Sequence, residues 1–88
     1  MKSHLSVAFR AQLARLPDDA QRQARAAYIL FERDPFHPSL QFKHLSGLEL
    51  WSARVGSGYR ALGMRSGDAI IWRWIGPHAE YDQILRRG

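Results

Sequence analysis

The residues with the clearest chemical potential lie in the segment WSARVGSGYRAL, residues 51–62, where Arg54 and Arg60 stand on either side of Gly56-Ser57-Gly58. Strand-forming residues surround this break, so the segment predicts a β-hairpin. A three-residue loop places Arg54 directly opposite Arg60, whereas a two-residue loop moves Arg54 to the other face. Because like charges directly opposite destabilise a sheet, the paired arrangement calls for a negative partner.

Two further turns extend the prediction to Arg73 and Lys43. A two-residue turn at Ser66-Gly67 puts Arg60 opposite Arg73, and one at Ser46-Gly47 puts Lys43 further along the same face. The sequence therefore predicts a basic row across one face of a sheet. Arginine forks match phosphate geometry, so a phosphate backbone is one candidate partner.

Two alternatives to a phosphate partner stay open. Acidic side chains of the chain itself can balance the row, or the arginines can be scattered over a solvated face. The acidic candidates are Glu49, Asp68, Glu80 and Asp82.

The segment GPHAEYD, residues 76–82, holds the second candidate chemistry. His78 directly follows the last predicted strand, which places it at the edge of the sheet. A histidine can transfer protons near neutral pH, and Tyr81 or Glu80 can hold it or act as its acid–base counterpart. The alternative is that His78 is a surface residue at the start of a helix.

No metal or cofactor site is expected. The chain has four histidines without zinc-like spacing and no cysteine, so thiolate ligands and disulfides are excluded. Gly56 and Gly58 do not form a dinucleotide fingerprint, because no helix follows them. Trp51, Trp72 and Trp74 could stack on bases, but core packing is the expectation for all three.

The 88 residues predict one domain, residues 1–88, with 45% apolar residues and a net charge of +5. A small basic domain favours anionic partners: nucleic acid, an acidic protein or a membrane surface. No apolar run approaches the roughly 20 residues of a membrane span. No signal peptide is visible, so the cytoplasm is the expected location.

The first half predicts two antiparallel helices, over residues 6–16 and from Asp18 to about Asp34. Asp18 and Gln21 have capping-box spacing. SHLSV leads straight into helix, so a strand before it is expected to be truncated or missing. Strands are expected over 41–45, 48–55, 59–64 and 68–75, followed by a short helix over 78–87. The fold class is therefore α+β: a helix pair packed on an antiparallel meander. The face to be covered by the helices carries Phe42, Trp51, Val55, Tyr59, Ile70, Trp72 and Trp74.

Three segments together resemble the RelE/ParE superfamily, the toxins of type II toxin–antitoxin pairs: FKHLSG (42–47), WSARVGSGYRAL (51–62) and IIWRWIGPHAEYD (70–82). Their order and spacing carry the resemblance, which extends over nearly the whole chain. The resemblance implies a compact antiparallel sheet with two helices on one face, and a cognate antitoxin that neutralises the toxin.

Within that superfamily, the RelE branch cuts messenger RNA, usually on the ribosome, whereas the ParE branch inhibits DNA gyrase and cleaves nothing. Lys43, Arg54 and Arg60 match the basic positions of the nuclease branch, His78 its histidine or arginine, and Tyr81 its C-terminal tyrosine. The resemblance thus implies an mRNA interferase, a metal-independent RNA endonuclease. The alternatives are a ParE-like gyrase inhibitor and a non-toxic nucleic-acid-binding relative.

For the nuclease, Arg54, Arg60, His78 and Tyr81 are the predicted catalytic residues. Lys43, Arg73 and Glu80 are the predicted RNA-binding residues.

Overall fold

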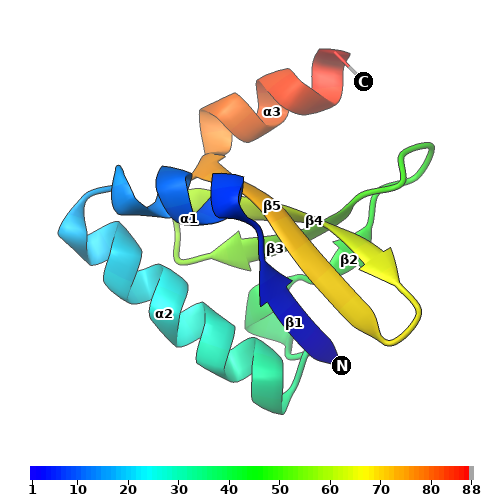
Figure 1. Ribbon diagram of the computed structural model, residues 1–88. Coiled ribbons are helices and arrows are strands. Elements are labelled where there is room, and N and C mark those ends of the chain that lie inside the picture. Colours follow the sequence, from blue (N-terminus) through cyan, green and yellow to red (C-terminus); the bar gives the residue numbers. More distant parts are fainter. Residues whose placement is uncertain (88) are drawn as a thin grey trace.

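The computed structural model describes residues 1–87 as a five-stranded sheet with helices on both faces (Figure 1). The strands are β1 (Lys2–Leu5), β2 (Lys43–His44), β3 (Trp51–Val55), β4 (Tyr59–Ser66) and β5 (Ala69–Pro77). The helices are α1 (Val7–Ala14), α2 (Asp18–Arg33) and α3 (His78–Arg87), with a 3₁₀ helix, η1 (Pro38–Leu40). The predicted α+β class is confirmed.

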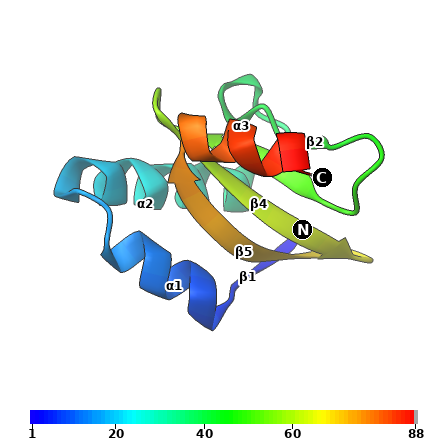
Figure 2. The same cartoon turned by 90° about the horizontal axis from the view of Figure 1, so that it is seen from above.

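The sheet has the spatial order β1-β5-β4-β3-β2. Strands β2 to β5 form the predicted antiparallel meander, and α1 and α2 lie on one side of it. Figure 2 shows α3 on the opposite side from α1, running above β4 and β5. No helix among residues 1–87 has the length and apolar character to cross a membrane.

The strand before the first helix was expected to be truncated or missing, and the second alternative is wrong, because the four-residue β1 pairs in parallel with β5. The backbone N–H of Lys2 donates to the carbonyl of Asp68 at 2.8 Å, and that of Ser6 to the carbonyl of Trp72 at 3.0 Å. Ser6 then caps α1, since its Oγ accepts from the N–H of Phe9 at 3.1 Å. A short strand and a helix cap therefore share the SHLSV segment.

The start of α2 also differs from the prediction. Asp18 is the first helical residue, and Pro17 at the cap position makes no side-chain hydrogen bond. Gln21 instead reaches back to the end of the preceding turn, donating from Nε2 to the carbonyl of Leu16 at 2.9 Å. The polar side chain thus joins the two helices rather than completing a capping box.

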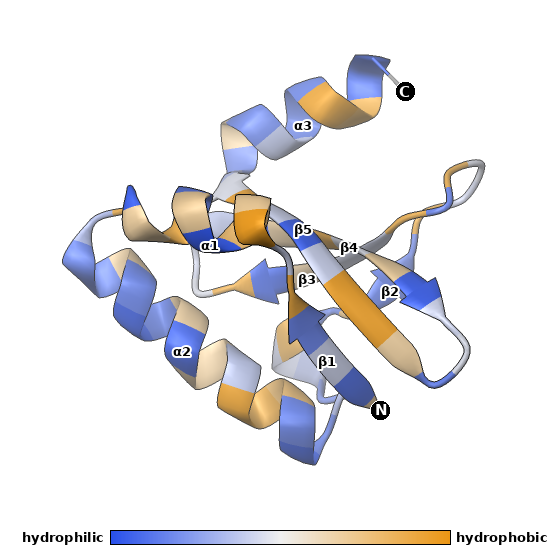
Figure 3. Cartoon of the chain, in the orientation of Figure 1, coloured by the Kyte–Doolittle hydropathy of each residue, from blue (hydrophilic) through white to orange (hydrophobic). Residues whose placement is uncertain are grey.

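The core lies between the sheet and the α1–α2 pair. Phe31 on α2 packs edge-on against Phe42 and Trp72, with ring centroids 4.9 Å and 5.4 Å apart. Of the residues predicted for this face, all except Trp74 belong to the core cluster or pack against it. The apolar run of β5 appears in orange in Figure 3, next to β1.

A bulge between β4 and β5 explains the exception. Leu62 pairs with Trp74 and Gly63 with Trp72, so Arg73 is the extra residue on β5. Gly63 permits this close approach, because a Cβ there would lie 2.9 Å from both the Ile71 carbonyl oxygen and the Trp72 ring. The bulge moves Trp74 to the face away from Trp72.

The predicted pairing of Arg60 with Arg73 is wrong as well. The turn after β4 is made by Gly67 and Asp68, since Ser66 pairs with Ala69. Together with the bulge, this shift places Gly76 opposite Arg60. The three-arginine row therefore does not form.

Candidate functional site

The pairing of Arg54 with Arg60 is confirmed. Val55 pairs with Tyr59 and Arg54 with Arg60, as the three-residue loop requires. The two guanidinium groups have separate acceptors: Arg54 Nε donates to the Gly56 carbonyl at 2.9 Å, and Arg60 Nη2 to Gln41 Oε1 at 2.9 Å. Both acceptors are neutral, so the hydrogen bonds orient the arginines without cancelling their charge.

Among residues 1–87, no carboxylate forms an ion pair with the arginines. Among residues 1–87, the one ion pair within 4.0 Å joins His78 Nε2 to Asp82 Oδ2 at 3.5 Å. Glu49, Asp68 and Glu80 lie outside this distance from every lysine and arginine nitrogen of those residues. None of these acids therefore forms a direct ion pair with the arginines of the sheet among residues 1–87.

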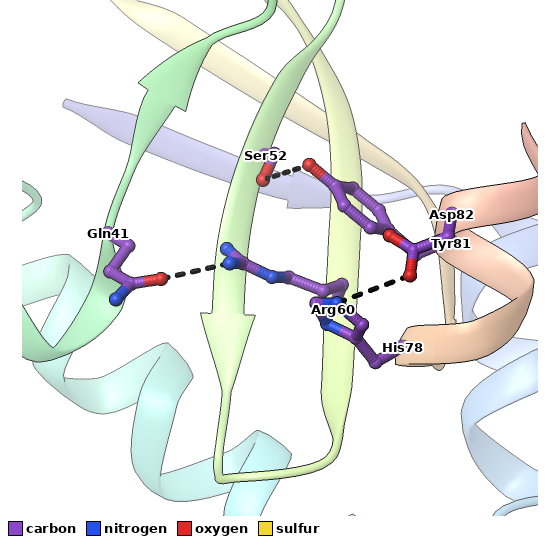
Figure 4. Close-up of polar contacts among 6 residues, drawn as sticks. All are labelled: Gln41, Ser52, Arg60, His78, Tyr81 and Asp82. Carbon is purple, nitrogen blue, oxygen red and sulfur yellow. Dashed lines mark hydrogen bonds and ion pairs between the residues drawn. The ribbon is translucent and has the colours of Figure 1, made fainter. Parts of the chain in front are cut away.

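Arg60 is held on two sides. Its side chain crosses β3 to reach Gln41, and its Cζ lies 5.3 Å from the centre of the Tyr81 ring (Figure 4). A cation over an aromatic face gains electrostatic stabilisation from the ring. The remaining terminal nitrogen, Nη1, is buried and has no hydrogen-bond partner among residues 1–87. Arg60 therefore has a fixed direction and an unused donor.

Tyr81 docks α3 on the sheet. Its side chain is buried, and its hydroxyl donates to Ser52 Oγ at 3.2 Å, where Ser52 is 0% exposed. Figure 4 shows the Tyr81 ring reaching from α3 across to Ser52 on β3. In this arrangement the Tyr81 hydroxyl is engaged by the protein, and the ring is the part that meets Arg60.

His78 is the first residue of α3, and its backbone N–H donates to the Gly58 carbonyl at 3.0 Å. The arginine hairpin thus fixes the start of this helix. The His78 and Asp82 side chains are 53% and 45% exposed, and the His78 ring centre lies 5.7 Å from that of Tyr81. His78 and Arg60 therefore contact the same aromatic ring.

Glu80 is exposed on the first turn of α3, close to β5. A Cβ at Gly76 would lie 3.1 Å from Glu80 Oε2 and 2.6 Å from the Trp74 ring, so glycine leaves the room that both side chains occupy. Since Gly76 pairs with Arg60 in the sheet, the Glu80 carboxylate belongs to the same region of the molecule.

The structure keeps Lys43 on the predicted face of the sheet but does not place Arg73 opposite Arg60. Lys43 pairs with Ser52 rather than Leu50. This shift of two residues keeps Lys43 on the predicted face, because side chains alternate with a period of two. Arg73 is exposed at the bulge and is not brought opposite Arg60.

Two polar partners of the site, Gln41 and Ser52, were not predicted from the sequence. Ser52 stands between Trp51 and Ala53 in a strand, and a polar residue at a buried strand position is a weak signal of a specific partner. Gln41 follows η1 with φ 47° and ψ 42°, and nothing in the local sequence indicates that backbone conformation.

Solved structures that share this fold include antitoxin–toxin complexes and a toxin. The toxin in the RelB–RelE antitoxin–toxin complex of Methanococcus jannaschii superposes with a TM-score of 0.74 and 18% identity, covering 93% of this chain and 98% of that one. For the RelE–RelB complex of Pyrococcus horikoshii the TM-score is 0.69 and the identity 20%, covering 86% and 92%. For the YoeB/ParE toxin of Agrobacterium tumefaciens the TM-score is 0.65 and the identity 17%, covering 89% of this chain and 99% of that one.

The sequence model of the ParE-like toxin domain matches residues 18–83, so the chain belongs to this family, and the predicted superfamily is confirmed. No curated protein matches the sequence.

Proposed function

We propose that this protein is the toxin of a type II toxin–antitoxin pair and that it cleaves messenger RNA without a metal ion. The observation that carries the proposal is the state of Arg60. Its guanidinium is held by neutral groups, forms no ion pair with a carboxylate among residues 1–87, and shares the Tyr81 ring with the exposed His78. A fixed cation beside a proton-transfer group is what cleavage of a phosphodiester requires.

RNA supplies its own nucleophile, which is why no metal is needed. A base removes the proton of a 2′-hydroxyl, and the 2′-oxygen attacks the adjacent phosphorus. The bond from phosphorus to the 5′-oxygen breaks, and that oxygen takes up a proton. The products are a 2′,3′-cyclic phosphate and a 5′-hydroxyl.

Arg60 is suited to stabilise the phosphate, on which negative charge accumulates as the attack proceeds. Lys43 lies on the same face and adds positive charge, and Arg54 stands next to Arg60 in the sheet. Preorganised charge of this kind is often the largest single contribution to catalysis. Among residues 1–87, no carboxylate forms an ion pair with these side chains, which leaves their charge available to the substrate.

His78 is our candidate for the proton transfers. Asp82 lies one helical turn further along and can orient the His78 ring through the contact of 3.5 Å. The reaction also needs a second acid–base group beside His78, and this group has to be exposed. Glu80, on the same turn of the helix, fits this requirement. Tyr81 fits less well as an acid or base, because its hydroxyl is buried against Ser52. We assign the Tyr81 ring to the positioning of Arg60.

The test is a map of RNA 5′ ends in bacteria after brief induced expression of the protein. The His78→Ala variant is compared with His4→Ala, which removes an exposed histidine from β1. We expect new ends within translated messages for the wild type and for His4→Ala. We expect those ends to fall by about 10²–10⁴-fold for His78→Ala. Full cutting by His78→Ala would contradict the assignment.

Growth arrest without new RNA ends would instead point to gyrase or another protein target, with the arginine hairpin as a docking surface. In that case His78→Ala stays toxic, whereas Arg60→Glu loses toxicity. Salt-dependent RNA binding without growth arrest would indicate a non-toxic nucleic-acid-binding relative.

A cognate antitoxin is part of the proposal. The structural relatives include toxins solved together with antitoxins, which supports such a partner here. We expect a short neighbouring gene for an acidic or DNA-binding protein, and co-expression of that protein should restore growth. Because the proposed substrate is messenger RNA, we expect the protein to act in the cytoplasm, whether or not the ribosome takes part.

A further inference from the structure

Gln41 has an unusual backbone for its residue type. With φ 47° it is in the left-handed region, where it is the sole non-glycine residue with positive φ among residues 1–87. Such a conformation is costly for a side chain with a Cβ, and it persists when the surrounding structure requires it. Its side chain makes the hydrogen bond to Arg60 Nη2 across β3. The unfavourable backbone and the contact with the candidate site therefore belong to the same residue.

The chemistry of the Gln41 side chain matters for Arg60. A carboxylate at this position would form a stronger, charge-assisted bond, but it would also neutralise the guanidinium. An amide oxygen orients the guanidinium and leaves its full positive charge for another anion. A neutral acceptor is thus the appropriate partner for an arginine that has to bind phosphate.

Arg60 needs such a partner because it stands directly opposite Arg54. The two guanidinium groups repel each other, and Arg54 is held by the Gly56 carbonyl at its own end of the hairpin. Gln41 accepts a hydrogen bond from the Arg60 guanidinium across β3, and the Tyr81 ring of α3 packs against the same guanidinium. Loss of the Gln41 acceptor leaves the Tyr81 ring as the remaining contact that directs the guanidinium.

We propose that Gln41 is a positioning residue, which fixes the direction of the Arg60 guanidinium and preserves its charge for the scissile phosphate. This role rests on the RNA-cleaving function proposed above. Gln41 does not touch the substrate and acts through Arg60.

Two substitutions of Gln41 separate its effect on the direction of the Arg60 guanidinium from its effect on the charge of that group. Gln41→Gly removes the acceptor and also relieves the left-handed backbone, so the thermal midpoint should stay the same or rise. Gln41→Glu keeps an acceptor for Arg60 but cancels its charge. Gln83→Glu introduces the same charge change at an exposed position of α3 and serves as the matched control.

The first readout is the ¹⁵N NMR spectrum of the arginine side chains in the purified protein. It does not depend on RNA. In the wild type and in Gln41→Glu, we expect separate signals for the two terminal nitrogens of Arg60, because rotation of the guanidinium is slow. In Gln41→Gly they should average as in an exposed arginine, because the hydrogen bond that restricts rotation is gone.

The second readout is the affinity for a single-stranded 2′-O-methyl RNA, whose blocked 2′ oxygen prevents cleavage. We expect Gln41→Gly and Gln41→Glu each to weaken binding by about tenfold, the equivalent of one hydrogen bond to a charged group. The Gln83→Glu control should stay within about twofold, since an exposed charge is screened by salt.

Unchanged Arg60 signals in Gln41→Gly would overturn the positioning role, and so would an affinity equal to that of the wild type. A lower thermal midpoint with unchanged affinity would show a purely structural residue. If the wild type neither binds nor cuts RNA while Gln41→Gly still frees Arg60, the contact itself is supported and the RNA chemistry is refuted.

Discussion

The two faces of the sheet differ in how completely other parts of the chain pack against them and pair with their polar groups. On the face toward α1 and α2, Phe31, Phe42 and Trp72 pack against one another and are nearly excluded from solvent. On the face toward α3, Arg60 has a buried donor without a partner and no carboxylate within ion-pair distance among residues 1–87. Alternate residues of the same strands therefore build the fold on one side and leave unbalanced charge on the other.

This difference indicates where each kind of mutation should act. Changes on the α1–α2 face should lower the free energy of unfolding, with activity lost only as far as the protein unfolds. Changes to the charged side chains on the α3 face should alter RNA cleavage with little effect on stability.

The largest effect is expected for Phe31→Ala, which removes a ring that is 2% exposed. The loss of packing should lower the free energy of unfolding by about 3–5 kcal/mol, as measured by urea denaturation. Phe36→Ala is the control, because Phe36 also contacts Phe42 but is 61% exposed. Equal losses for the two variants would contradict the location of the core.

The next effect concerns Arg60→Gln, on the opposite face. Removal of the fixed cation should lower the single-turnover cleavage rate by about 10²–10³-fold, with an unfolding midpoint close to that of the wild type. Arg65→Gln removes the same charge from the other end of β4, where Arg65 lies 5.0 Å from the Trp51 ring. A similar rate loss in both variants would mean that only net charge matters.

Tyr81→Phe separates the ring from the hydroxyl. The substitution leaves Ser52 without its partner, so stability should fall by about 1 kcal/mol. Because the ring stays over Arg60, the cleavage rate should remain within about threefold of the wild type, far from the loss expected for a proton-transfer group. Rate measurements that show a loss of a hundredfold or more would restore Tyr81 as an acid or base.

The smallest effect is expected for Arg73→Gln. The bulge removes Arg73 from the position opposite Arg60, so its contribution to RNA affinity should be that of an exposed charge, about 1 kcal/mol or less. Titration of single-stranded RNA with Arg73→Gln and Arg60→Gln side by side gives the comparison. Equal losses would support the three-arginine row predicted from the sequence.

Much of this arrangement could be predicted because it depends on local signals. The helical stripes, the turn residues and the three-residue loop gave both helices of the pair, the meander and the pairing of Arg54 with Arg60. The closing helix was also predicted, and its observed bounds are His78–Arg87. Lys43 stayed on the predicted face although its partner changed, because a shift of two residues preserves alternation.

The errors arose where distant contacts decide the structure. The bulge depends on the Trp72 ring lying close to Gly63, and β1 exists because β5 offers it a parallel partner. A glycine within a strand was the available signal for the bulge. Gln41 follows η1 in the left-handed conformation and contacts Arg60, which is 19 residues away in the sequence, so its local sequence could not identify it.

The most direct test of the central claim is the chemistry of the RNA ends in a reconstituted translation reaction with one defined message. We predict fragments with a 2′,3′-cyclic phosphate and a 5′-hydroxyl, and no cut where the nucleotide before the scissile phosphate carries 2′-deoxyribose. Cleavage that persists at the 2′-deoxy position, or fragments with a 5′-phosphate, would contradict attack by the 2′-hydroxyl. An intact message beside the active wild-type protein would contradict RNA cleavage altogether.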